Sequence, residues 1–193
     1  MAGRNAYIAP FLEHHPEIDD SAYIAQTAAV VGAVRIGKNS TIWHQVTLRG
    51  DNHFITIGEG TNIQDNSCVH INSRDYPTII GNHVNIGHCA LVHACKLHDH
   101  AFVGMGSIIM DGAVIESNGM LAAGAMLTPR KRIPSGELWA GRPARKMRDL
   151  TTDEIDENRR IARHYIEVGR AHRLGAAGGT FIDMQSHPLP PRD

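Results

Sequence analysis

Histidine is the residue type in this sequence that points most directly to chemistry. The chain has 193 residues, of which 13 are histidines, and His70, His88 and His93 lie within one short stretch. Neutral imidazole is the commonest side-chain ligand for transition metals. Three imidazoles around one ion with a fourth position open are typical of catalytic zinc, whereas structural zinc sites are closed. These residues predict a metal site if the fold brings them together.

The three cysteines, Cys68, Cys89 and Cys95, offer no competing metal or disulfide chemistry. They form an odd set without a C-x-x-C pair, which is a poor disulfide framework and a poor zinc-thiolate site. We interpret all three as free thiols buried in the core.

Charge and hydrophobicity narrow the class of protein. The formal net charge is −1, which argues against a general nucleic-acid or membrane-surface binder. The first residues lack a basic region followed by an apolar run, and no stretch approaches the roughly 20 apolar residues of a membrane span. We therefore expect a soluble, cytoplasmic protein that has neither nucleic acid nor membrane as a partner.

A six-residue period runs through most of the chain and determines where the histidines lie. With two insertions and one shortened interval, an aliphatic residue recurs every six positions at Ile18, Ile24, Val30, Ile36, Ile42, Leu48, Ile57, Ile63, Val69, Ile80, Ile86, Val92, Leu97, Val103, Ile109, Ile115, Leu121, Leu127 and Ile133. Four residues after most of these comes a small or β-branched residue, as at Ala22, Ala28, Ser67, Ser73, Ala90 and Ser107. Neither a helix (period 3.6) nor a plain strand (period 2) explains this pattern. Large and small residues that alternate inward suit the corners of a narrow triangular coil.

This pattern resembles the hexapeptide repeat of left-handed parallel β-helices, in which three hexads form one triangular turn. The resemblance implies a mainly β fold, and the handedness comes from the resemblance and not from the period. We expect an N-terminal lead-in over residues 1–17, the β-helix over 18–148, a C-terminal α-helix over 149–173 and a Gly/Pro-rich tail over 174–193. The sequence TTDE at 151–154 predicts a capping box that opens the helix.

Counting the hexads in threes assigns each histidine to a face of the coil. Arg49, His70 and His93 occupy the same position in successive coils and form one outward column. Adjacent strands lie about 4.8 Å apart, so His70 and His93 could share a metal ion at about 2.0–2.1 Å per bond. Asp65 and His88 fall in a second column on the preceding face. His88 therefore points away from the His93 of its own chain, and a neighbouring subunit of a homotrimer would supply the third imidazole.

A histidine on a β surface is usually only a polar surface residue. We expect this of several others along the coil: His44, His53, His83, His98 and His100. His98 is a useful control, because it has the hexad position of His93 but lies on the next face. The alternative to metal binding is that His70, His88 and His93 are also only polar surface residues. Their convergence on one site favours metal binding.

Five segments resemble γ-class carbonic anhydrases and their close bacterial homologues: RGD at 49–51, NIQDNSCVH at 62–70, IGHCALVHACKL at 86–97, VGMGS at 103–107 and AGRPARKMR at 140–148. The resemblance implies that His70, His88 and His93 bind Zn²⁺, or alternatively Fe²⁺ or Co²⁺, between subunits of a homotrimer. A zinc ion in such a site lowers the pKa of its water to about 7 and so permits hydration of CO₂ to bicarbonate.

The family resemblance also assigns roles to residues beside the ligands. It implies an ionic network at the subunit interface formed by Arg49, Asp51 and Asp65. It further implies that Gln64 orients the solvent bound to the metal.

The chain departs from the most active members of the family in its acidic residues. Those members carry a glutamate where this chain has Asn52, and a second in the loop between the first two ligand histidines. Here that connection is residues 72–78, which contain no glutamate. Removal of the proton is therefore left to His53, Tyr165 or buffer, and we expect hydration to be slow or dependent on conditions.

Two other functions stay open. An acyltransferase or thioesterase is one, because many hexapeptide-repeat proteins use acyl-CoA; it would use a histidine as general base without metal. A metal-binding interaction trimer with weak or no catalysis is the other, docking a partner through Gly141–Pro143 or the C-terminal helix.

Overall fold

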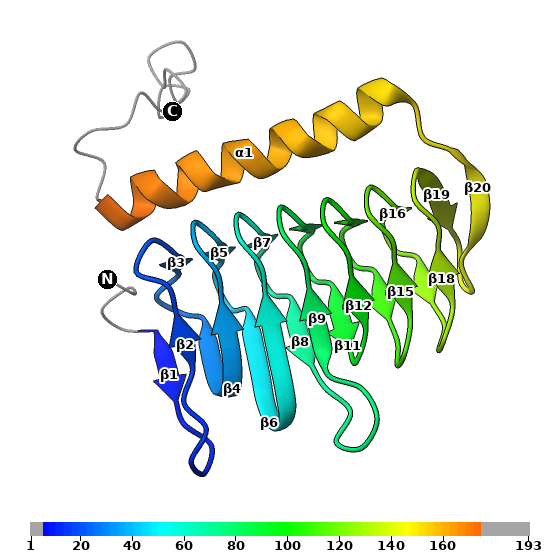
Figure 1. The fold of residues 1–193 in the computed structure, drawn as a ribbon. Coiled ribbons are helices and arrows are strands. Elements are labelled where there is room, and N and C mark those ends of the chain that lie inside the picture. The colour runs from blue at the N-terminus through cyan, green and yellow to red at the C-terminus, as the bar shows by residue number, and fades with distance from the viewer. Residues whose placement is uncertain (1–5, 175–193) are drawn as a thin grey trace, which may run out of the picture.

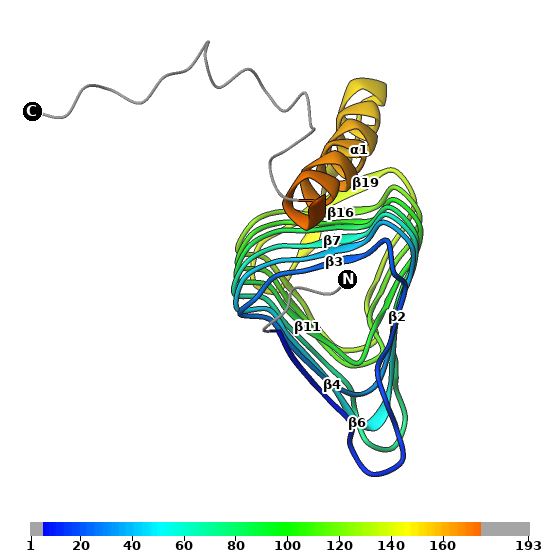
Figure 2. The same cartoon turned by 90° about the vertical axis from the view of Figure 1, so that its left-hand side faces the viewer.

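The computed structural model describes residues 6–174 and shows a triangular coil of short parallel strands (Figures 1 and 2). The predicted parallel β-helix of hexapeptide repeats with one C-terminal helix is thereby confirmed. The predicted tail at 174–193 lies outside the described residues except for Leu174, and so do the first five residues of the lead-in.

The first face of the coil carries the histidine column. It is formed by β1 (Tyr7–Ala9), β8 (Cys68–His70), β11 (Leu91–His93), β14 (Ile108–Ile109), β17 (Met126–Leu127) and the first halves of β4 (Ala29–Ile36) and β6 (Thr47–Ile57). The second halves of β4 and β6 continue into the second face with β2 (Glu17–Ile18), β9 (Thr78–Ile80), β12 (Lys96–Leu97), β15 (Val114–Ile115) and β18 (Arg132–Ile133). Both long strands protrude at the corner between these two faces (Figure 2).

The third face is a separate sheet that lies beneath the helix. Its parallel strands are β3 (Tyr23–Ile24), β5 (Thr41–Ile42), β7 (Asn62–Ile63), β10 (Asn85–Ile86), β13 (Phe102–Val103), β16 (Met120–Leu121) and β19 (Glu137–Ala140). The last strand, β20 (Arg145–Asp149), lies beyond the last aliphatic residue of the repeat and runs antiparallel to β19. The chain reverses there after the cis peptide bond between Arg142 and Pro143, which ends the coil before the helix begins.

The core confirms the six-residue period. Nearly all of the aliphatic positions are buried, and the small residues four positions later fill the corners beside them. The buried hydroxyls among these residues donate to carbonyls of the next coil, as Ser67 does to Gly87 and Ser107 to Ala122. A buried donor without a partner would cost about 1–3 kcal/mol, so these bonds make serine acceptable inside the coil.

Two expectations about burial are wrong. Ser73 is exposed, because it lies in the loop between β8 and β9 and not at a corner of the coil. The cysteines are all free, but only Cys95 is buried; Cys68 is half-buried and Cys89 is exposed. Cys68 precedes the inward Val69 and Cys89 occupies a turn, so neither side chain enters the core.

The C-terminal helix α1 (Thr152–Leu174) runs back along the coil toward its N-terminal end (Figure 1). The predicted capping box is present: Thr151 Oγ1 accepts from the Glu154 N–H at 3.2 Å, and Glu154 Oε2 accepts from the Thr151 N–H at 2.9 Å. The helix packs on β3, β5, β7 and β10. Among residues 6–174, no helix has the length and apolar character needed to cross a membrane.

Candidate metal centre

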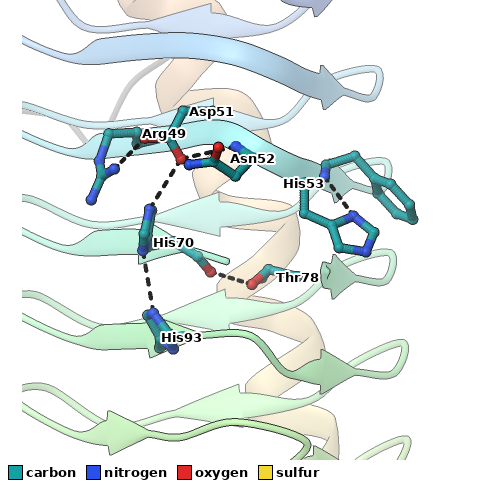
Figure 3. A network of polar contacts seen from close by, with 8 residues as sticks. Arg49, Asp51, Asn52, His53, His70, Thr78 and His93 are labelled. Carbon is teal, nitrogen blue, oxygen red and sulfur yellow. Dashed lines mark hydrogen bonds and ion pairs between the residues drawn. The ribbon is translucent and has the colours of Figure 1, made fainter. Parts of the chain in front are cut away.

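His70 and His93 lie side by side on neighbouring strands, as the six-residue period predicts. Strands β8 and β11 pair in parallel with His93 directly opposite His70. His70 Nδ1 is 3.2 Å from His93 Nε2 (Figure 3). Two ligands at about 2.0–2.1 Å from one tetrahedral ion are about 3.3–3.4 Å apart. The two nitrogens therefore have nearly the spacing of two ligands of a single ion.

The other ring nitrogen of His70 faces Asp51. His70 Nε2 is 3.4 Å from Asp51 Oδ1, and the Arg49 guanidinium donates to the same carboxylate (Figure 3). Burial tends to raise the pKa of Asp51, but the hydrogen bond and charge of Arg49 lower it overall. Burial, aided by the charge of Arg49, lowers the pKa of His70. The pair thus consists of a carboxylate and a neutral imidazole, which is the protonation state that metal binding requires.

His93 has a carboxylate partner as well. Its Nδ1 is 2.7 Å from Asp111 Oδ1, and Asn72 Nδ2 donates to the second oxygen, Asp111 Oδ2, at 2.7 Å. Burial opposes ionisation of Asp111, but the hydrogen bonds of Asn72 and His93 outweigh it and lower the pKa of this carboxyl. A carboxylate that accepts from Nδ1–H leaves Nε2 of His93 as a lone-pair donor toward His70.

His88 lies apart from this pair, in the turn between β10 and β11, and its side chain is 44% exposed. Its Nδ1 is 3.0 Å from Asp65 Oδ2. Each of the three predicted ligands therefore has one ring nitrogen facing a carboxylate. Within residues 6–174 of a single chain, no group of three or more His, Cys, Asp or Glu side chains is arranged to hold a metal ion.

Gln64 precedes Asp65 in the turn between β7 and β8 and is half-buried. Its Nε2 donates to Asn62 Oδ1 at 3.2 Å, and Asn62 in turn donates to Asn85. Both asparagines are 1% exposed. The predicted site glutamine is therefore anchored to a buried polar network.

Tyr165 lies on α1 and lines a surface hollow with Trp43, His44, Asp65 and His172. Its ring packs edge-on against Trp43, with centroids 5.9 Å apart. Burial and the nearby charge of Asp65 raise the pKa of Tyr165. The hydroxyl is thus a poor proton acceptor at neutral pH, and the tyrosine belongs to the second column and not to the His70–His93 pair.

The other candidate proton acceptor, His53, lies at the protruding end of β6. Its Nδ1 accepts a hydrogen bond from the N–H of Phe54, and its ring packs against that of Phe54 (Figure 3). His98, the control, pairs with Glu116 at 3.5 Å on the second face, away from the histidine column.

Comparison with known proteins identifies the family. The chain is 40% identical over 166 residues to a carbonic anhydrase of Geobacillus kaustophilus, covering 86% of this chain and 91% of that protein. It is 46% identical over 162 residues to the mitochondrial gamma carbonic anhydrase 1 of Arabidopsis thaliana, covering 81% of this chain. The chain belongs to the γ-class carbonic anhydrase family. It spans only 59% of the length of that Arabidopsis relative, and no protein-family model matches it.

Solved structures agree on the fold of this family member. A hexapeptide transferase family protein from Anaplasma phagocytophilum superposes with a TM-score of 0.84 at 48% identity, covering 88% of this chain and 99% of the other. A Bacillus cereus protein described as a putative acetyltransferase gives a TM-score of 0.86 at 37% identity, covering 88% and 98%. Both proteins are named for transfer chemistry, whereas the two sequence relatives above are named as carbonic anhydrases.

Sequence reasoning missed four polar residues of this region: Asn72, Asn85, Asp111 and Asn158. The sequence does contain a signal at Asn62 and Asn85. Both directly precede an inward isoleucine on the face beneath the helix, and a polar residue is unusual at that position. Asp111 and Asn72 gave none, since their contact with each other joins a turn to an insertion loop.

Proposed function

We propose that this chain catalyses the reversible, metal-dependent hydration of CO₂ to bicarbonate at three equivalent sites of a homotrimer. The single observation that carries the proposal is the 3.2 Å separation of His70 Nδ1 and His93 Nε2. Two imidazoles at this spacing supply two of the three ligands of a three-imidazole site. Membership of the γ-class carbonic anhydrase family supports the same reaction.

His88 of a neighbouring copy is the proposed third ligand. It lies in the turn between β10 and β11, is partly exposed and has its own carboxylate partner, so it is available to a second molecule. A divalent ion bound by the three imidazoles, Zn²⁺ or alternatively Fe²⁺ or Co²⁺, would act as a Lewis acid that lowers the pKa of water to about 7. Gln64 would orient the reacting solvent, and Arg49, Asp51 and Asp65 would fix the subunit register.

The outward side of the first face supports an assembly. The residues that precede its inward aliphatics are largely apolar: Cys68, Leu91, Ile108 and Met126. Leu91 is 39% exposed in the single chain, although it sits on a strand beside the proposed ligands. A copy packed on this face would cover that apolar surface and bring its His88 to the pair.

Stopped-flow hydration of CO₂ by the zinc-loaded protein tests the activity, and mixing of variants tests the shared site. His88→Ala and His93→Ala should each be inactive as homotrimers. Subunits of the two variants, unfolded together and refolded at equal amounts, should regain about a quarter of wild-type activity, because every mixed trimer then contains one intact site. His98→Ala is the matched control and should keep full activity. No recovery on mixing would refute a site shared between subunits.

Acyl transfer is the second candidate, favoured by the transferase names of the two proteins of similar structure. In that reaction His93 would be the general base, and Asp111 would orient it by accepting a hydrogen bond from its Nδ1. Turnover of acyl-CoA by metal-free protein, inhibited when zinc is added, would support it over hydration. A cytoplasmic location stays a prediction, since the Arabidopsis relatives are named as mitochondrial.

A further inference from the structure

Four side-chain amides form a continuous ladder from the C-terminal helix to Gln64. Asn158 of α1 donates from Nδ2 to the backbone carbonyl of His100 at 2.7 Å. Asn85 Nδ2 donates to the backbone carbonyl of Asn158 at 2.9 Å and also to its side-chain oxygen. Asn62 donates to Asn85, and Gln64 Nε2 donates to Asn62 Oδ1 at 3.2 Å.

The backbone fixes the direction of this ladder. A carbonyl can only accept, so the carbonyls of His100 and Asn158 require the NH₂ groups of Asn158 and Asn85 to point toward them. The oxygen of Asn85 must then face Asn62, so Asn62 has to donate from its NH₂ to that oxygen. By the same step the oxygen of Asn62 faces Gln64, whose NH₂ must donate to it. The oxygen of Gln64, Oε1, is left as the free end of the ladder.

Burial makes reversal of the ladder costly. Asn62 and Asn85 are 1% exposed and Asn158 is 5% exposed, so water is not at hand to satisfy a flipped amide. A single flip would set two NH₂ groups or two oxygens against each other inside the protein. Gln64 alone, half-buried in its turn, has no such constraint of its own.

We infer that Asn85 and Asn158 are positioning residues that hold Gln64 with its oxygen turned outward as a hydrogen-bond acceptor. This inference rests on the proposed function, in which Gln64 contacts the reacting solvent. An acceptor at that position holds a solvent molecule or bicarbonate through its O–H, and it disfavours ligands that have only lone pairs to offer. The C-terminal helix thereby acts on Gln64 through the ladder.

The unaltered protein provides the first test. The full sequence has four glutamines, so protein labelled with ¹⁵N on glutamine side chains gives a simple NMR spectrum in which Gln64→Glu identifies one signal. The NH₂ protons of Gln64 should exchange with solvent about tenfold or more slowly than those of the exposed Gln26 and Gln45. Equal exchange rates would overturn the ladder as a constraint on Gln64.

A pair of substitutions at Asn85 then separates orientation from packing. Asn85→Asp, with its buried carboxyl protonated, keeps an oxygen facing Asn62 and an O–H facing the Asn158 carbonyl, whereas Asn85→Leu removes both groups. Exchange at Gln64 should accelerate about tenfold in Asn85→Leu and stay within about twofold of wild type in Asn85→Asp. A folded Asn85→Leu protein that retains slow exchange would contradict the inference.

Kinetics supply the second readout. With metal content equal in all three proteins, kcat for hydration should fall about tenfold in Asn85→Leu, and Asn85→Asp should restore most of it. Equal kcat values in the two variants would contradict a positioning role. If the wild type hydrates no CO₂ but the exchange results hold, the proposed function fails while the ladder stands.

Discussion

Asp111 Oδ1 lies 2.7 Å from Nδ1 of His93, the nitrogen remote from His70. Asn72, from the loop that interrupts the repeat, holds the second oxygen of the same carboxylate. This arrangement fixes the tautomer and the orientation of His93 before any ion binds. The insertion loop therefore supports the proposed metal centre even though it contains no glutamate.

Asp111→Asn should weaken metal binding by about 10- to 100-fold, because loss of a carboxylate behind a histidine ligand typically has this effect. The new amide could still accept from His93, but its NH₂ would then face that of Asn72. Competition with a chromophoric chelator measures the affinity for Zn²⁺. Glu116→Gln, which alters the carboxylate of the control His98, should leave the affinity unchanged. Similar losses in both variants would point to a general effect of charge.

Metal binding should stabilise the assembly as well as the subunit. At a free Zn²⁺ concentration 100 times Kd, the gain is about 2.7 kcal/mol per site. Thermal unfolding with and without a chelator should therefore show a higher Tm for the loaded wild type. His88→Ala should lose this metal-dependent shift while retaining the Tm of the metal-free protein. A shift that persists in His88→Ala would show that the ion binds elsewhere.

Neighbouring residues on β14 should separate folding from assembly. Ile109 is fully buried in the coil, so Ile109→Ala should destabilise the fold by about 2–5 kcal/mol, measured by denaturant unfolding. Ile108 points outward beside the histidine column. Ile108→Glu should leave the circular dichroism spectrum unchanged and shift the mass in analytical ultracentrifugation from trimer toward monomer. An unchanged trimer would place the interface on another face.

Docking of α1 should weaken in acid through Glu154. The Arg148 guanidinium and the Thr151 N–H lower the pKa of this carboxyl to about 2, against about 4.3 in an unfolded chain. Its contribution is therefore complete above about pH 4.3 and is lost as the pH falls toward 2. The difference in Tm between wild type and Glu154→Gln should shrink over this range. A difference that stays constant with pH would exclude the ion pair as its source.

The sequence predicts the coil and the His70–His93 pair because both depend on a period that local counting reveals. An inward aliphatic every six residues leaves little freedom in where the next side chain points. The direction of β20 was not predictable in this way, since the reversal after Pro143 breaks the repeat that the counting relies on. The exposure of Cys89 follows from a turn geometry that the period does not describe.

The supporting residues of the site were harder to predict, because their contacts join segments that are distant in sequence. Asn72 reaches Asp111 across 39 positions, and Asn85 reaches Asn158 across 73. Asn85 stands out only as a polar residue on a largely apolar face, and Asn72 and Asn158 are ordinary residues of a loop and a helix by sequence. Only the docking of α1 on the third face turns Asn62, Asn85 and Asn158 into one network.

The course of α1 has a consequence for how the molecule is made. Chains emerge from the ribosome N-terminus first, so the coil can wind up while the helix is still being synthesised. At that stage His70 and His93 already share a face, whereas the amides beneath the helix still meet water. In the nascent chain, His70 and His93 would thus come together before the orientation of the Gln64 side chain is fixed. Maturation of the site would proceed in two steps, the second waiting for the last helical segment to return along the finished coil.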